Sequence, residues 1–65
     1  MKMSYFEDTD TLYIEFKETD ISESRDLDEN TILDLDINDD IVAITMEHAS
    51  ARTDIQHLTL TGIAA

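Results

Sequence analysis

The chain has 65 residues, no cysteine and a formal net charge of −12 from 16 acidic and 4 basic side chains. This length allows one small domain, and without disulfides or a Cys/His metal cluster we expect self-association to supply further buried surface. The charge disfavours binding to nucleic acid phosphates and to anionic membranes, and it favours a cation or a basic protein partner.

The hydropathy pattern predicts a folded, soluble, cytoplasmic protein. No apolar run approaches the roughly 18 residues of a membrane span, and the first five residues lack an apolar signal-peptide core. The hydrophobic content of 42%, patterned as alternating Ile and Leu, favours a fold over disorder.

The first predicted element is a hairpin. Alternation at period 2 through residues 11–16 predicts a strand with Leu12, Ile14 and Phe16 on the core side and Tyr13 and Glu15 on the outer side. A two-residue loop at residues 8–9 places Met3 opposite Ile14. The same register places Tyr5 opposite Leu12, so residues 3 and 5 join the core side.

The next segment, residues 21–27, alternates only weakly. Ile21 and Leu27 are in phase, with Glu23 and Arg25 between them, and such a polar strand fits the edge of a sheet. A turn follows at residues 28–30, where Asn30 can adopt positive φ at little cost.

The most apolar part of the chain predicts a second hairpin. Residues 31–37 alternate, with Leu33, Leu35 and Ile37 on one side, and Ile32, Asp34 and Asp36 on the other. Residues 38–40 form the turn. Residues 41–46 are apolar on both sides, so this strand should be covered on both sides, by the C-terminal tail or by another subunit.

The C-terminal part leaves the strand pattern. Ser50 is a plausible helix N-cap, and residues 53–56 have capping-box spacing, which predicts a short helical turn. Residues 57–61 alternate again and predict an extended tail, but Gly62 is equally suited to end a helix through this region.

These elements predict the α+β class: an antiparallel β-meander of four or five strands with one short helix or helical turn near Ser50. We expect a single domain over residues 1–65, with its core in residues 3–50 and a helical turn and tail in residues 50–65. The two-sided apolar strand favours a homodimer. The predicted core comprises Met3, Tyr5, Leu12, Ile14, Phe16, Leu33, Leu35, Val42, Ile44 and Met46.

The clearest candidate site is a pair of carboxylates. Two residues apart on a strand, Asp34 and Asp36 would project from one side about 7 Å apart, a spacing that suits a shared cation or an acid/base pair. Tyr13 and Glu15 can share that side. The alternative is an ordinary solvated sheet face, since alternating polar residues are what a half-exposed sheet requires.

Other patterns predict no catalytic, cofactor or metal site. The three acidic turns lack the ligand spacing, central glycine and closing glutamate of a calcium loop. His48 and His57 lack the further ligands that zinc needs. Ser22, Ser24 and Ser50 have no nucleophile-elbow context. We expect Arg25 and Arg52 to pair with nearby carboxylates.

Several short motifs follow one another along the chain. They are Tyr5, Asp10-Thr11-Leu12-Tyr13-Ile14, Ser24-Arg25-Asp26-Leu27, Ile32-Leu33-Asp34-Leu35-Asp36, Ile41-Val42-Ala43-Ile44 and Ala49-Ser50. Together they resemble the domain-of-unknown-function 2283 family, a group of small, mostly bacterial proteins. The resemblance spans about residues 3 to 50. It implies a compact β-rich domain and no established activity, and some relatives look like partners of small toxin-like proteins.

The chain departs from this pattern at four positions. Asn30, Asp39 and Ala43 stand where the family pattern has glycine, and Phe6 stands where it has aspartate. The turn geometries implied by the resemblance, and any role of that aspartate, therefore do not transfer directly.

Three functions are compatible with the sequence. The first is a protein-interaction module whose acidic sheet face, with Tyr13, Glu15, Asp34 and Asp36, binds a basic partner such as a toxin-like protein. The second is a carboxylate-based enzyme or cation-binding protein using Asp34 and Asp36. The third is a ligand-free, self-assembling structural domain.

Overall fold

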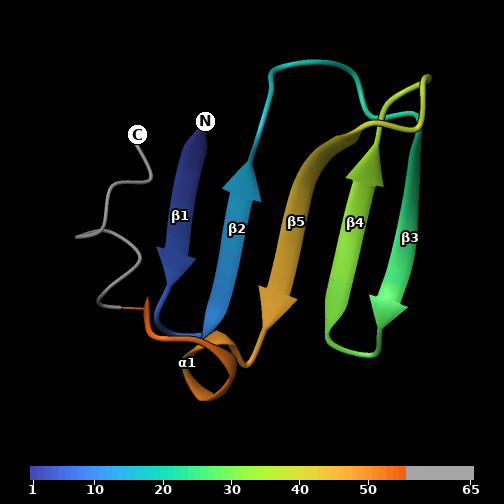
Figure 1. Cartoon of the computed structure of the whole chain (residues 1–65). Helices are drawn as coiled ribbons and strands as arrows, with labels where there is room; N and C mark the ends of the chain where they lie inside the picture. Colours follow the sequence, from blue (N-terminus) through green and yellow to red (C-terminus); the bar gives the residue numbers. More distant parts are fainter. Residues whose placement is uncertain (56–65) are drawn as a thin grey trace.

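A computed structural model describes residues 1–55 of the chain as one antiparallel sheet of five strands followed by a short helix (Figure 1). No helix in this part of the chain is long and apolar enough to cross a membrane. The elements are β1 (Lys2–Phe6), β2 (Thr11–Glu15), β3 (Glu23–Asp28), β4 (Thr31–Leu35), β5 (Ile41–Glu47) and α1 (Ala49–Arg52).

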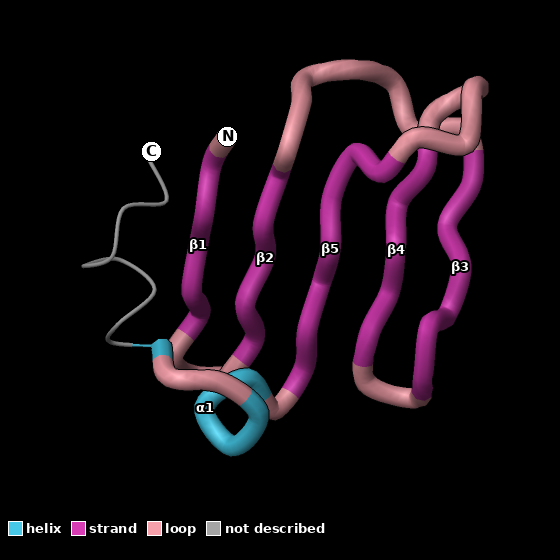
Figure 2. Tube along the Cα trace, in the orientation of Figure 1, coloured by secondary structure: helices cyan, strands magenta, loops and turns pink. Residues whose placement is uncertain are grey.

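The strand order is β1-β2-β5-β4-β3, so the sheet is antiparallel as predicted but is not a simple meander. The connection over residues 16–22 crosses one end of the sheet from β2 to β3 (Figure 2). Its ends are held by backbone hydrogen bonds from Phe16 N to Val42 O (2.7 Å) and from Ser22 N to Leu35 O (2.8 Å). The central position suits β5, because this strand is apolar on both sides and pairs along both of its edges there.

The predicted register of the first hairpin is confirmed. Met3 pairs with Ile14 and Tyr5 with Leu12. The edge position predicted for the polar strand is also confirmed, because β3 is the outer strand next to β4 and all six of its residues are exposed. Its pairing with β4 is interrupted by a bulge between Asp26 and Asp28, a feature that discourages further pairing at an edge.

The strand predicted through residue 37 ends earlier, at Leu35. The Asp36 carboxylate accepts hydrogen bonds from the backbone N–H groups of Asn38 (2.8 Å) and Asp40 (3.0 Å). Asp39 has φ 64°, a left-handed conformation that glycine adopts without strain. Asp36 therefore builds a wider turn, and Ile37 in that turn is 86% exposed.

The helical turn expected near Ser50 is present as α1, but Ser50 is not its N-cap. That position belongs to His48, which has left-handed backbone angles and makes no side-chain capping bond. Ser50 instead lies inside the helix, with its hydroxyl bonded to Asp10. The predicted capping box, which needs Gln56, and the extended tail lie outside the described residues.

Cross-strand pairing divides the sheet into two faces. On β2, β5 and β4, the apolar face carries no charged residue, and β3 adds Glu23, Arg25 and Asp28 at its margin. The other residues of this face are Met3, Tyr5, Leu12, Ile14, Thr31, Leu33, Leu35, Val42, Ile44 and Met46. The polar face carries the other set: Lys2, Ser4, Phe6, Thr11, Tyr13, Glu15, Ser24, Asp26, Ile32, Asp34, Ala43, Thr45 and Glu47.

The core is only partly closed by the described residues. Of the predicted core, Leu12, Leu35 and Val42 are buried, six residues are partly exposed, and Phe16 is 39% exposed. Ala43 and Ala49 are fully buried as well. The smallest principal extent is 16 Å, the thickness of one sheet with its side chains rather than of two stacked layers about 10 Å apart.

The free energy of unfolding should depend on the few buried apolar residues. We expect Leu35→Ala to lower the free energy of unfolding by about 2–3 kcal/mol, because it opens a cavity at a buried site. Ile37→Ala is the matched control two residues away and should change it by less than about 0.5 kcal/mol. Urea unfolding of both variants checks this, and equal losses would contradict the described burial.

Candidate functional site

The structure brings together three of the four predicted site residues on the polar face. Glu15 and Asp34 both pair with Ala43 of β5, from opposite sides. At the usual strand spacing, their Cα atoms are about 10 Å apart across Ala43. Ala43 is fully buried, so the longer neighbouring side chains close over it, and a single surface carries both carboxylates.

Tyr13 belongs to the same surface, in the neighbouring cross-strand row with Thr45. Burial, followed by the negative charges of Glu15 and Asp34, raises the pKa of the Tyr13 phenol. Both carboxylates therefore act on the tyrosine. The Ser24 hydroxyl donates a hydrogen bond of 2.6 Å to Asp34, which fixes that carboxylate on the polar face.

Asp36 does not join this group, so the predicted geometry of an Asp34/Asp36 pair is wrong. Asp36 is 6% exposed and forms an ion pair with Lys17. Its hydrogen bond from Lys17 holds the pKa of the carboxyl below its ordinary value of 3.8, helped by the N–H groups of the turn. The Asp36 carboxylate thus stabilises its turn and is not available to a shared cation.

A second group of polar residues, which no sequence pattern connects, lies at the α1 end of the sheet. The Asp10 carboxylate accepts hydrogen bonds from the Tyr5 hydroxyl (2.5 Å), the Ser50 hydroxyl (2.8 Å) and the Ser50 N–H (3.1 Å). The Asp10 carbonyl also accepts the Ala49 N–H at 3.0 Å. Asp10 thus joins β1, the β1–β2 turn and α1, across 40 residues of sequence.

Asp10, Tyr5 and Ser50 form the Asp10 cluster. Its electrostatics suit a structural contact better than catalysis. The hydrogen bond from Tyr5, followed by that from Ser50, lowers the pKa of the Asp10 carboxyl. The same bond to Asp10 raises the pKa of the Tyr5 phenol. A carboxylate with lowered proton affinity is a weaker base, and these hydrogen bonds stabilise the charged form of Asp10.

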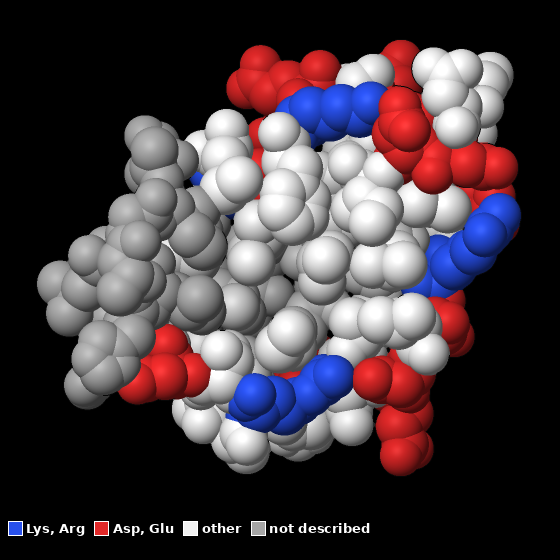
Figure 3. Space-filling view, in the orientation of Figure 1, with Lys and Arg blue, Asp and Glu red and all other residues white. Residues whose placement is uncertain are grey.

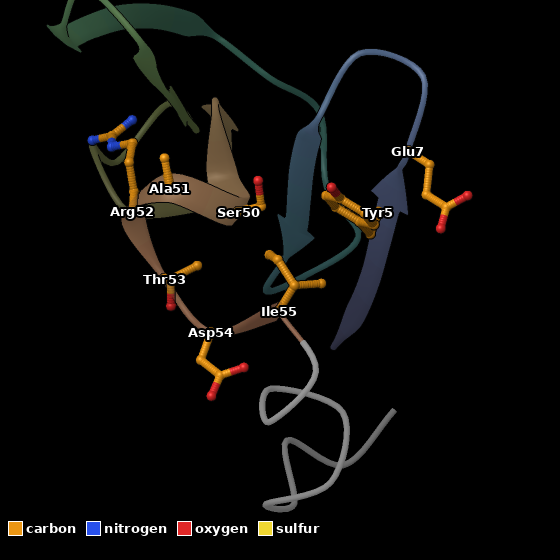
Figure 4. Close-up of a pocket in the computed structure, with 8 residues that line it drawn as sticks. All are labelled: Tyr5, Glu7, Ser50, Ala51, Arg52, Thr53, Asp54 and Ile55. Atoms are coloured by element: carbon orange, nitrogen blue, oxygen red, sulfur yellow. The ribbon is translucent and has the colours of Figure 1, made fainter.

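A cavity of about 790 Å³ adjoins this cluster. Its labelled lining residues come from β1, from the turn after it and from the segment 50–55 (Figure 4). The Glu7 side chain points away from Tyr5 and Ser50, and Arg52 projects to the opposite side (Figure 4). Because the Tyr5 and Ser50 hydroxyls donate to Asp10, these two groups have no proton left to donate to a ligand.

The arginines pair with carboxylates, as predicted. Arg25 lies 2.8 Å from Glu23, and Arg52 lies 3.2 Å from Asp28. Arg52 also donates to the carbonyls of Asn30 and Glu47, at 3.1 and 3.3 Å. Within residues 1–55, no group of three or more His, Cys, Asp or Glu side chains is placed to hold a metal ion.

The pH dependence of stability tests the role of Asp36. Its folded-state pKa is lowered, so its charge stabilises the fold above the unfolded value near 3.8, and this contribution disappears as pH falls through the folded value. We therefore expect Asp36→Asn to lower the urea midpoint at neutral pH and the difference from wild type to shrink below about pH 4.

The control is Asp20→Asn, which removes the same charge from an exposed connection. Its midpoint should stay at or slightly above that of wild type, because the chain is strongly acidic. A difference between Asp36→Asn and wild type that stays constant down to about pH 2.5 would show that the carboxylate charge is not its source.

Comparison with known proteins places the chain in a family without a described activity. No curated protein matches the sequence, and no solved structure matches it. A family model matches residues 2–50, which include all five strands and the start of α1. The chain therefore belongs to the family described as protein of unknown function DUF2283.

Proposed function

We propose that this protein is a non-catalytic interaction module whose polar face binds a basic protein partner. The observation that carries the proposal is the joint placement of Tyr13, Glu15 and Asp34 on adjacent cross-strand rows of that face. Asp26 and Glu47 add two further carboxylates to the same face, against the single cation Lys2.

The chemistry of this surface favours arginine in the partner. A guanidinium can pair with a carboxylate through parallel hydrogen bonds and can also lie against an aromatic ring. Glu15 and Asp34 supply the carboxylates, and Tyr13 supplies the ring, within one surface. The net charge of −12 would steer such a partner towards the module over distances of about a Debye length, roughly 8–10 Å at moderate salt.

The enzymatic alternative has less support. The predicted carboxylate mechanism needs Asp34 and Asp36 in one site. Asp36 is instead paired with Lys17 and accepts a hydrogen bond from the turn that follows β4. The basic partner can be a toxin-like protein whose cationic surface is covered by the polar face. The proposal includes a cytoplasmic location.

A binding titration with a matched charge control tests the proposal. The probe is an arginine-rich peptide, added to the full chain at about 50 mM and about 300 mM salt. We expect the double variant Glu15→Gln/Asp34→Asn to bind it about fivefold more weakly than wild type, since two exposed ion pairs together contribute on the order of 1 kcal/mol.

The control variant, Glu18→Gln/Asp20→Asn, removes the same two charges from the exposed connection between β2 and β3. It should bind almost as tightly as wild type. Equal weakening of both variants would show that the peptide senses only the net charge. An affinity that is the same at both salt concentrations would contradict electrostatic binding altogether.

A further inference from the structure

The apolar face lacks a covering layer among the described residues. On β2, β5 and β4 it presents only apolar side chains and Thr31, and residues in its centre, among them Ile14, Leu33 and Ile44, are partly exposed. Figure 3 shows this face as a broad area of uncharged atoms with charged atoms at its margin. An apolar sheet face of this kind is normally packed against another layer.

The dimensions of the face suit a second sheet. The principal extents are 33, 27 and 16 Å, so the molecule is a slab whose broad faces are those of the sheet. Two sheets pack face to face about 10 Å apart, with interdigitating side chains. A second sheet would therefore complete the two-layer architecture that a domain of this kind requires.

The distribution of charge is compatible with another copy of the chain as this second sheet. Lys and Arg atoms lie at the margin of the apolar face beside Asp and Glu atoms (Figure 3), and Lys17, Arg25 and Arg52 each form ion pairs with carboxylates. The margin is thus locally neutralised, and two copies with a net charge of −12 can approach there. The polar face, with four carboxylates and one cation, would repel its own copy.

Other modes of self-association fit less well. Extension of the sheet through β3 is opposed by its bulge and by its charged residues Glu23, Arg25, Asp26 and Asp28. A face that meets an identical face needs a self-complementary surface, and an uncharged apolar area satisfies this requirement in a two-fold dimer. We propose that the apolar face binds the apolar face of a second copy, which forms a two-fold sheet-on-sheet dimer.

Sedimentation equilibrium of the full chain, with a matched pair of variants, tests this proposal. Wild type should have the dimer mass at about 50 µM, and Leu33→Ser should raise the dimer dissociation constant at least about tenfold. Ile32→Ser is the control, because it makes a similar change at the neighbouring, equally partly exposed residue on the polar face. It should leave the dissociation constant within about twofold of wild type. A monomeric wild type, or equal weakening by both variants, would overturn the proposal.

A second measurement needs no variant and covers the case in which Leu33→Ser does not fold. In a mixture of labelled and unlabelled full chains, isotope-filtered NMR should show contacts between copies at the methyl groups of Ile14, Leu33 and Ile44. Intermolecular contacts at Ile32, Ala43 and Thr45 instead would overturn the proposal. Because this dimer leaves the polar face open, its failure would not affect the binding of a basic partner.

The response to added salt distinguishes the dimer from the binding of a basic partner. Added salt screens the repulsion between two acidic copies, so the dimer should be at least as tight at about 300 mM salt as at about 50 mM. Binding of the arginine-rich peptide should weaken over the same range. A dimer that dissociates as salt is added would contradict association through an uncharged face.

Discussion

The structure depends on the burial of β5 at the centre of the sheet. Val42 and Ala43 are 2% and 0% exposed and point to opposite faces of this strand, which pairs with β2 on one side and β4 on the other. A strand apolar on both sides is least costly where neighbouring strands and side chains surround it. This position forces the crossing connection over residues 16–22 and separates the sheet into an apolar and a polar face.

Carboxylates stabilise the turns and connect the elements of this fold, roles that glycine and a larger core have in other domains. Asp10 and Asp39 adopt positive φ, a conformation that aspartate tolerates better than most residues. Asp10 fastens α1 to the first hairpin, and Asp36 organises the turn after β4. Motif residues that could suggest chemistry, namely Tyr5, Asp10, Asp36 and Ser50, are thus engaged within the fold. The proposed function therefore rests on the surfaces that remain.

The period-2 pattern was sufficient to predict the strands, the register of Met3 with Ile14 and the edge position of β3, because these follow from alternation and loop length. It could not predict the strand order, which depends on how a long connection crosses the sheet. It also misplaced Asp36, since an alternating sequence does not reveal that a side chain will bond its own turn. Asp10 and Ser50 are 40 residues apart in the sequence, and no local pattern connects residues at that separation.

The central claim is that the two faces have separate roles, and a methyl-resolved NMR spectrum of the full chain tests it directly. Dilution should shift the methyl signals of Leu33 and Ile44 on the apolar face, whereas addition of the arginine-rich peptide should shift those of Ile32, Ala43 and Thr45 on the polar face. Shifts at the same methyl groups under both conditions, or shifts on the opposite faces, would contradict the account.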